Sequence, residues 1–257
     1  MSGAITRRRI LRLLAGAPLL AASGGLATAT ESKRIAGLIG KAKGFPKIAD
    51  RIDLISRGLF GAKYVADTLI GGPKQPEKFV VYDDAFDCVT YCEIVLAAAL
   101  ADDMSRFETA LRQIRYHNGQ VVWRERNHYF SDWCARNIEN KICGPVAIDT
   151  VPIVKSSNLV PELGKQQWTL DVIPQATLLE SAAALQTGDI IGLISRRTDL
   201  DYAHTGFIAF GKDNGELLLR HASSTRLRVM EQPMAPFLAV NRTEYVTVVR
   251  PQDRPAA

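Results

Sequence analysis

Cys88 stands at the start of a predicted helix, directly after a loop, in the segment Phe86-Asp87-Cys88-Val89. The unpaired N–H groups and the macrodipole at a helix N-terminus favour a negative charge, which lowers the pKa of a thiol and makes thiolate available. A nucleophilic cysteine needs this placement. The same position also suits a small apolar core residue, since free cysteines are commonly buried. Position alone leaves these two alternatives open.

Two histidines fall on neighbouring predicted strands in the second half of the chain. His204 opens one strand directly after a polar loop, and His221 ends the next strand, 17 residues later across a predicted hairpin. Adjacent antiparallel strands can place the two imidazoles side by side. His204 could then take the thiol proton, and His221 could orient it and fix its tautomer. Each histidine taken alone is more often structural.

The remaining cysteines allow other interpretations. Cys88 and Cys92 are four residues apart on one helix face, and Cys134 and Cys143 complete the set of four. Their spacings do not match a familiar zinc pattern, so no metal and no cofactor is predicted. A Cys134–Cys143 disulfide would suit an oxidising compartment, but the sequence does not establish it.

Helices and strands must position these residues. The first half of the chain after residue 31 is predicted to be helical. Residues 32–70 form short amphipathic helices broken at Gly44-Phe45-Pro46 and at Gly58. A buried helix follows over 88–100. A second helix over 105–116 is opened by Ser105 with Glu108 three residues on, which is a capping-box pattern. A third helix covers 130–138.

The second half changes to short β-branched runs. They are predicted at 146–154, 189–195, 205–210, 216–221, 227–229 and 245–249, after an extended run at 79–82. Asp213-Asn214-Gly215 is a hairpin turn between two of them. Helices followed by strands without long helices between them indicate an α+β fold, with the N-terminal helices packed on a C-terminal antiparallel sheet.

Residues 1–29 differ from the rest and are predicted to be an export signal. Arg7, Arg8, Arg9 and Arg12 precede a short apolar run, and the segment ends in Ala27-Thr28-Ala29. Thr6-Arg7-Arg8-Arg9-Ile10-Leu11 also resembles a twin-arginine signal, so we expect a periplasmic protein without a stable membrane anchor after cleavage. The alternative is an uncleaved anchor or a basic arm. Residues 30–257 are then one catalytic domain with a helical N-terminal extension over about 32–72.

The charge supports this division. The whole chain has 32 Lys and Arg against 27 Asp and Glu, a formal charge of +5. Four of the basic residues and none of the acidic ones lie in the predicted signal, so the mature part is close to neutral. This balance, without a basic stripe interleaved with aromatics, argues against a nucleic-acid partner.

Together, the ordered segments resemble the NlpC/p60 superfamily of papain-like cell-wall cysteine peptidases and amidases, and most closely its N-acetylmuramoyl-L-alanine amidase-like branch. The segments that carry this resemblance run in the family's order from about residue 79 to 230. They are Tyr82-Asp83-Asp84-Ala85-Phe86-Asp87-Cys88, Arg126-Asn127-His128-Tyr129-Phe130-Ser131-Asp132-Trp133, Thr187-Gly188-Asp189-Ile190, His204-Thr205-Gly206-Phe207 and His221-Ala222-Ser223-Ser224.

The resemblance implies a papain-like fold with Cys88 as nucleophile, His204 as base and His221 as orienting group. It also places Tyr82 at the border of the oxyanion and substrate site. The further residues predicted to bind substrate are Asp87, His128, Tyr129, Ser131, Asp132, Trp133 and Ser223. The 128–133 segment is expected on a helix near the cleft, although its aromatic residues at helical spacing could equally be core.

The predicted reaction is acyl transfer through a thioester, and the resemblance implies the bond. It is the amide between N-acetylmuramic acid and L-Ala in peptidoglycan fragments, including anhydro-muropeptides, with no metal required. Two alternatives stay open. One is an endopeptidase that cuts between D-Glu and the diamino acid, and the other is an inactive cell-wall binding module that kept the fold.

Overall fold

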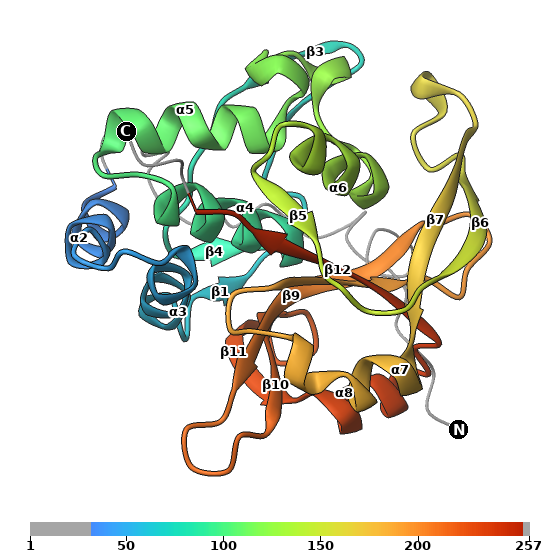
Figure 1. Cartoon of the computed structure of the whole chain (residues 1–257). Coiled ribbons are helices and arrows are strands. Elements are labelled where there is room, and N and C mark those ends of the chain that lie inside the picture. The colour runs from blue at the N-terminus through green and yellow to red at the C-terminus, as the bar shows by residue number, and fades with distance from the viewer. Residues whose placement is uncertain (1–31, 254–257) are drawn as a thin grey trace.

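The computed structural model describes residues 32–253, and the predicted signal peptide lies outside this range. Helices dominate the first half and strands the second, which confirms the predicted α+β class (Figure 1). The α-helices are α2 (Lys33–Ala42), α3 (Ile48–Gly58), α4 (Cys88–Ala99), α5 (Met104–Arg115), α6 (Phe130–Glu139), α7 (Gln175–Glu180) and α8 (Met234–Val240).

The strands form one large, mostly antiparallel sheet and a small hairpin. The large sheet has the order β4-β1-β11-β10-β9-β8-β12-β7-β6, with β5 paired to β12, and only β1 and β4 are parallel. Its strands are β1 (Lys63–Tyr64), β4 (Ala85–Phe86), β5 (Cys143–Pro145), β6 (Val151–Ser157), β7 (Gln166–Pro174), β8 (Ile190–Ile194), β9 (Tyr202–Phe210), β10 (Leu217–Ser223), β11 (Arg228–Pro233) and β12 (Tyr245–Pro251). The hairpin pairs β2 (Ile70–Gly72) with β3 (Gln75–Lys78).

The N-terminal helices form where the apolar spacing predicts them. Ser32 caps α2 by accepting a hydrogen bond from the Ile35 N–H at 3.2 Å. Ile52 and Ile55 turn the apolar face of α3 toward α4 and are fully buried. Both helices pack on α4 (Figure 1). The extension is therefore part of the main hydrophobic core rather than an appendage.

The structure differs from the prediction at several element ends. Helix α5 is capped by Asp103, whose carboxylate accepts from the Arg106 N–H at 2.8 Å, so the proposed capping box at Ser105 was wrong. The apolar run 79–82 pairs with no strand of the described chain. The strand expected over 146–154 is shifted to β6, and β7 was not predicted. Strand β9 begins at Tyr202, so His204 lies inside the strand instead of opening it.

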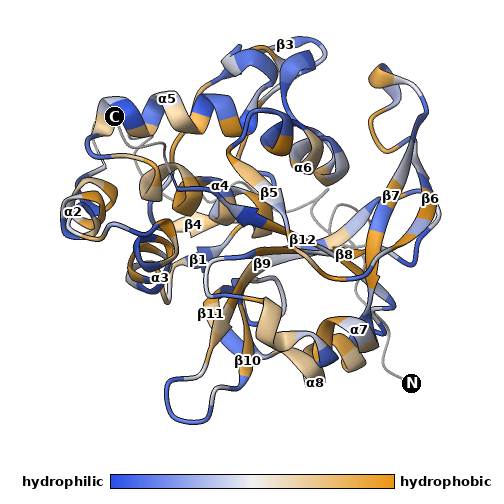
Figure 2. Ribbon diagram, viewed as in Figure 1, coloured by the Kyte–Doolittle hydropathy of each residue, from blue (hydrophilic) through white to orange (hydrophobic). Residues whose placement is uncertain are grey.

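Each face of the sheet packs against its own hydrophobic cluster. One contains α2, α3, α4 and the side chains of Phe207 and Ala222. The other contains residues of α7 and α8 with Ile208 and Leu219. Successive residues of β9 and β10 thus alternate between the clusters, as strand geometry requires. Figure 2 shows the loop joining β9 to β10 as hydrophilic.

Candidate active site

Cys88 is the first residue of α4, as predicted, and its neighbour Asp87 is the reason the helix begins there. The Asp87 carboxylate accepts from the N–H of Val89 at 2.9 Å and from that of Thr90 at 2.7 Å. The Thr90 hydroxyl accepts from the Asp87 N–H at 2.9 Å, which completes a capping box. The cap uses the second and third N–H groups of the helix, not that of Cys88. Cys88 is 4% exposed.

His204 and His221 lie side by side, as the hairpin predicts. Nε2 of His204 and Nδ1 of His221 are 2.6 Å apart, with the two ring planes at 89°. Gly206 makes this approach feasible, because a Cβ there would lie 2.9 Å from the Cβ of His221 and 2.8 Å from the Arg220 carbonyl oxygen. Phe237 of α8 contacts both rings, at centroid distances of 5.9 and 5.3 Å.

Burial fixes the charge state of His221. His221 is 1% exposed, and burial lowers its pKa to about 4 from an ordinary 6.5, so it is neutral at neutral pH. Its Nε2 has no hydrogen-bond partner among the described residues. Because Nε2 of His204 is engaged with His221, a proton exchanged with a thiol or a substrate would pass through Nδ1 of His204. A neutral acceptor behind His204 suits a base.

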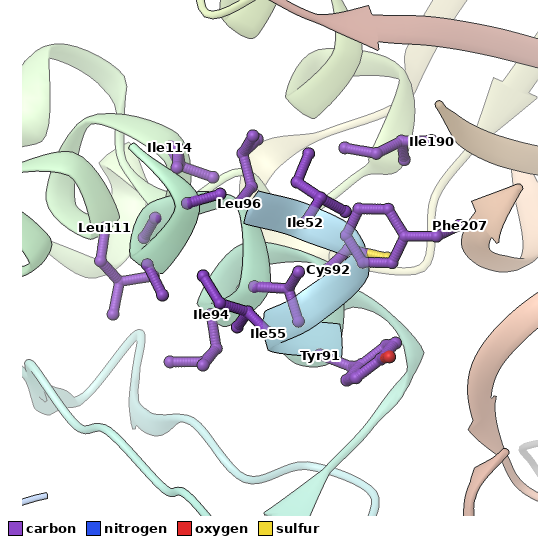
Figure 3. Packing of buried hydrophobic residues seen from close by; sticks show 14 of the residues in the cluster. Ile52, Ile55, Tyr91, Cys92, Ile94, Leu96, Leu111, Ile114, Ile190 and Phe207 are labelled. Carbon is purple, nitrogen blue, oxygen red and sulfur yellow. The ribbon is translucent and has the colours of Figure 1, made fainter. Parts of the chain in front are cut away.

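The residues next to the pair in sequence face the other way. Thr205 Oγ1 lies 3.9 Å from Cys92 Sγ, and the Phe207 ring packs edge-on against Tyr91 of α4 (Figure 3). His204 instead contacts Phe237. The structure thus joins two of the three predicted catalytic residues directly. It places the third, Cys88, at the start of the helix that packs on the opposite face of the same strands.

Three predicted substrate-binding residues lie near the ends of these motifs. Tyr82 lines a small cavity with Thr90 of the α4 cap and with Thr68, whose buried hydroxyl has no partner in the described chain. Asp87 has the capping role given above. Ser223 Oγ accepts from the Arg226 N–H at 3.2 Å and so shapes the turn after β10.

The segment 128–133 mainly packs the interior. His128 and Tyr129 precede α6 instead of lying on it. Trp133 is fully buried and stacks on Phe130, and the Ser131 hydroxyl donates to Asp201 at 3.0 Å.

The other residues of this segment connect α6 to neighbouring elements. Tyr129 packs on Trp168 of β7, and Asp132 accepts from the Trp168 indole N–H at 2.8 Å. The His128 imidazole lies 2.7 Å from the Trp123 carbonyl oxygen, and burial lowers its pKa. These contacts favour the packing interpretation of the aromatic residues, and their substrate contacts stay a prediction.

The cysteines other than Cys88 sit in inert surroundings. Cys92, Cys134 and Cys143 are buried free thiols, and burial raises the pKa of each, to about 12 for Cys143. Within residues 32–253, no group of three or more side chains is arranged to hold a metal ion. Every helix in that range is too short or too polar to cross a membrane.

Two contributors to the site escaped the sequence reasoning. Phe237 belongs to α8, a seven-residue helix. The spacing of Met234 and Leu238, both fully buried, was its only sequence signal. Gly206 was quoted in a motif without a role, and its position two residues after His204 on the same strand face is the signal that could have assigned one.

A family described as N-acetylmuramoyl-L-alanine amidase-like, AmiA-like, matches residues 54–244. The curated proteins contain no match. A Legionella pneumophila protein of the DUF1460 family is similar in fold, with 23% identity and a TM-score of 0.75 over 87% of this chain and 95% of that one. An N-acetylmuramoyl-L-alanine amidase from Bacteroides uniformis has 25% identity and a TM-score of 0.66 over 85% and 99%. A Bacteroides fragilis protein named a xylanase has 26% identity and a TM-score of 0.64 over 76% and 98%.

Proposed function

Because the chain belongs to the N-acetylmuramoyl-L-alanine amidase-like family, we propose that it is a cysteine hydrolase acting on the N-acetylmuramoyl-L-alanine bond of peptidoglycan fragments. The observation that carries the cysteine mechanism is the hydrogen-bonded pair of half-buried His204 and buried His221, which follows a cysteine at a capped helix start. A thiol, a base and a neutral group behind the base are the parts that nucleophilic acyl transfer requires.

The proposed reaction has two halves. The Cys88 thiol loses its proton to Nδ1 of His204, and the thiolate attacks the lactyl carbonyl carbon. The C–N bond breaks as His204 returns the proton to the leaving L-Ala nitrogen, which leaves a thioester. His204 then takes a proton from water, the resulting hydroxide attacks the thioester, and the carboxylate product leaves as the thiol is restored. The N–H of Cys88, which the Asp87 cap does not use, is the proposed oxyanion donor.

The similar structures are named for two different activities, an amidase and a xylanase, and the residues of the site favour one of them. A glycosidase commonly uses two carboxylates on either side of the scissile bond. Here the carboxylate next to Cys88 is engaged in capping α4, and the paired groups on β9 and β10 are imidazoles. This arrangement favours amide hydrolysis over glycoside hydrolysis.

The finer assignments belong to the same proposal. They are membership of the NlpC/p60 superfamily with a papain-like arrangement, and action on anhydro-muropeptides. The predicted signal peptide adds export by the twin-arginine route and work in the periplasm. The proposed partner is a peptidoglycan-derived muropeptide. An endopeptidase cutting between D-Glu and the diamino acid is the alternative, because it would use the same thiol and imidazoles.

A product assay tests the proposal. The purified protein is incubated with a defined disaccharide-peptide muropeptide, and the products are identified by mass. We expect the free sugar and an intact stem peptide starting at L-Ala. Cleavage inside the stem peptide would instead establish the endopeptidase, and no cleavage would leave a binding module.

A thiol-reactive probe tests whether Cys88 is the nucleophile. We expect Cys88 to be labelled near neutral pH and Cys88→Ala to abolish both labelling and turnover. Cys92→Ala is the matched control, since Cys92 lies one turn further along α4 and is fully buried. Full turnover by Cys88→Ala would refute the cysteine mechanism.

A further inference from the structure

Resting on the proposed function, we propose that Lys63 and Arg228 form a carboxylate-binding subsite that takes the anionic stem peptide of the substrate. The two residues are direct cross-strand partners in the antiparallel pairing of β1 with β11. Both are exposed. Neither makes an ion pair with any residue of the described range 32–253.

The pairing of Lys63 with Arg228 destabilises the fold unless an anion lies between them. Like charges directly opposite each other on adjacent strands repel and destabilise the pair. Arg226, also exposed, adds a third positive charge two residues before Arg228. In a mature chain that is close to neutral, such a cluster is not explained by overall composition. A bound carboxylate would remove the repulsion.

The subsite is aligned with the histidine pair. Ser223 of β10 is opposite Arg228 of β11, Arg228 is opposite Lys63 of β1, and Lys63 is opposite Ala85 of β4. Residues opposite each other share a sheet face, and Ser223 shares that face with His221, two residues before it on β10. With about 4.8 Å between strands, Lys63 lies about 10 Å from Ser223. The row ends on β4, which leads into Cys88.

Leu227 supplies a second observation at the same place. It has φ +56° in the turn between β10 and β11, and its side chain is 64% exposed. Leucine is disfavoured in this conformation, and an exposed side chain gains nothing from packing there. Glycine or asparagine would suit the turn better.

Val65, 42% exposed, lies two residues beyond Lys63, and its N–H donates to the Phe86 carbonyl oxygen at 2.9 Å. Leu227 and Val65 therefore give the cationic pair an apolar border beside the segment that carries the thiol. This combination fits a short peptide with carboxylates and a methyl side chain. A peptide with the sequence L-Ala-D-Glu-diamino acid has this chemistry.

The test compares two muropeptides that differ only in whether the stem-peptide carboxylates are free or amidated. For Lys63→Gln/Arg228→Gln we expect KM for the free-acid substrate to rise about tenfold with kcat little changed, because each exposed ion pair contributes a factor of a few. KM for the amidated substrate should stay as in the wild type. High salt should raise the wild-type KM and leave that of the double variant unchanged.

The matched control is Lys212→Gln, an exposed lysine in the loop joining β9 to β10, at the far end of that hairpin from His204. It should leave both KM values unchanged. An equal KM rise on both substrates, no rise on either, or the same rise in Lys212→Gln would overturn the subsite. Leu227→Gly should raise Tm and raise KM for the free-acid substrate, and a fall in Tm would contradict the strain argument.

Calorimetric binding of the free tripeptide L-Ala-D-Glu-diaminopimelate separates this proposal from the proposed function. If the wild type cleaves no muropeptide yet binds the tripeptide, and the double variant does not, the subsite stands and the amidase proposal fails. If muropeptides are cleaved but the tripeptide binds both proteins equally, the amidase proposal stands and the subsite fails.

Discussion

The two faces of β9 and β10 differ in how their buried polar groups are partnered. On the α4 face, Arg220 is fully buried between the carboxylates of Asp53 at 2.7 Å and Glu231 at 2.6 Å. Thr205 on the same face donates to the Ile191 carbonyl oxygen at 2.9 Å. On the α8 face, His204 and His221 bond to each other, and one nitrogen of His221 has no partner among the described residues.

The difference supports the proposal that the α4 face serves stability and the α8 face serves the proposed chemistry. Charges buried on the α4 face are paired, as a stable interior requires. On the α8 face, Nε2 of His221 is buried without a hydrogen-bond partner among the described residues, which lowers stability and is typical of functional sites. Substitutions at adjacent positions of one strand should therefore affect different properties.

The largest expected effect comes from a pair of neighbours on β9. His204→Ala should lower kcat/KM about 10³-fold, since it removes the proposed base, while Tm changes little. Thr205→Val should lower stability by about 1 kcal/mol through its lost hydrogen bond and keep most activity. Turnover and thermal melting measured on both variants check the contrast. Comparable activity losses would show that the two faces are not functionally distinct.

Arg220→Met tests the buried face alone. Removing the guanidinium breaks its charged hydrogen bonds to Asp53 and Glu231, which keep Arg57 as a second partner, so stability should fall by about 1.5–3 kcal/mol. Urea unfolding measures the change. Arg250→Met is the control, since Arg250 also pairs with a buried carboxylate, that of Asp189, but is itself partly exposed. A loss for Arg220→Met no larger than for this control would contradict the distinction drawn between the faces.

His221 links the second face to pH. Its pKa is about 4 when folded and 6.5 ordinarily, so between these values the unfolded chain binds more protons and stability falls as pH falls. The loss should approach about 3 kcal/mol near pH 4. His221→Asn has no titrating group there, so its unfolding free energy should depend less on pH over this window. Parallel pH curves for the two proteins would show that His221 is not buried in the neutral form.

The N-terminal helices show that a segment without a recognisable motif can still be part of the main hydrophobic core. Residues 32–72 matched nothing recognisable, and the family match begins at residue 54, inside α3. Yet Ile35, Ile39 and Ile52 are buried in the main core, and the Tyr91 hydroxyl donates to the Ser56 carbonyl oxygen at 3.1 Å. These helices support the base of the helix that carries Cys88.

The sequence by itself determined the elements and the pairing of the histidines. Apolar spacing predicted α2, α3 and α6, because one buried face per helix leaves a 3.6-residue period in the residues, and a continuous apolar run predicted α4, which is buried on nearly all sides. Hairpin turn chemistry placed His204 beside His221, because a short turn fixes which residues of two strands become neighbours.

Only the tertiary structure decided which face each side chain occupies and which polar residues are used in folding. The bulge between Leu193 and Ile194, opposite His204 and Tyr202, puts Tyr202 in the same cluster as Phe207 although they are five residues apart on β9, and it has no local signal in the sequence. Asp87, Ser131 and Trp133 are predicted site residues that also cap or pack, and their partners Thr90, Asp201 and Phe130 are chosen by packing. Long-range contacts of this kind leave no periodic trace in a single chain.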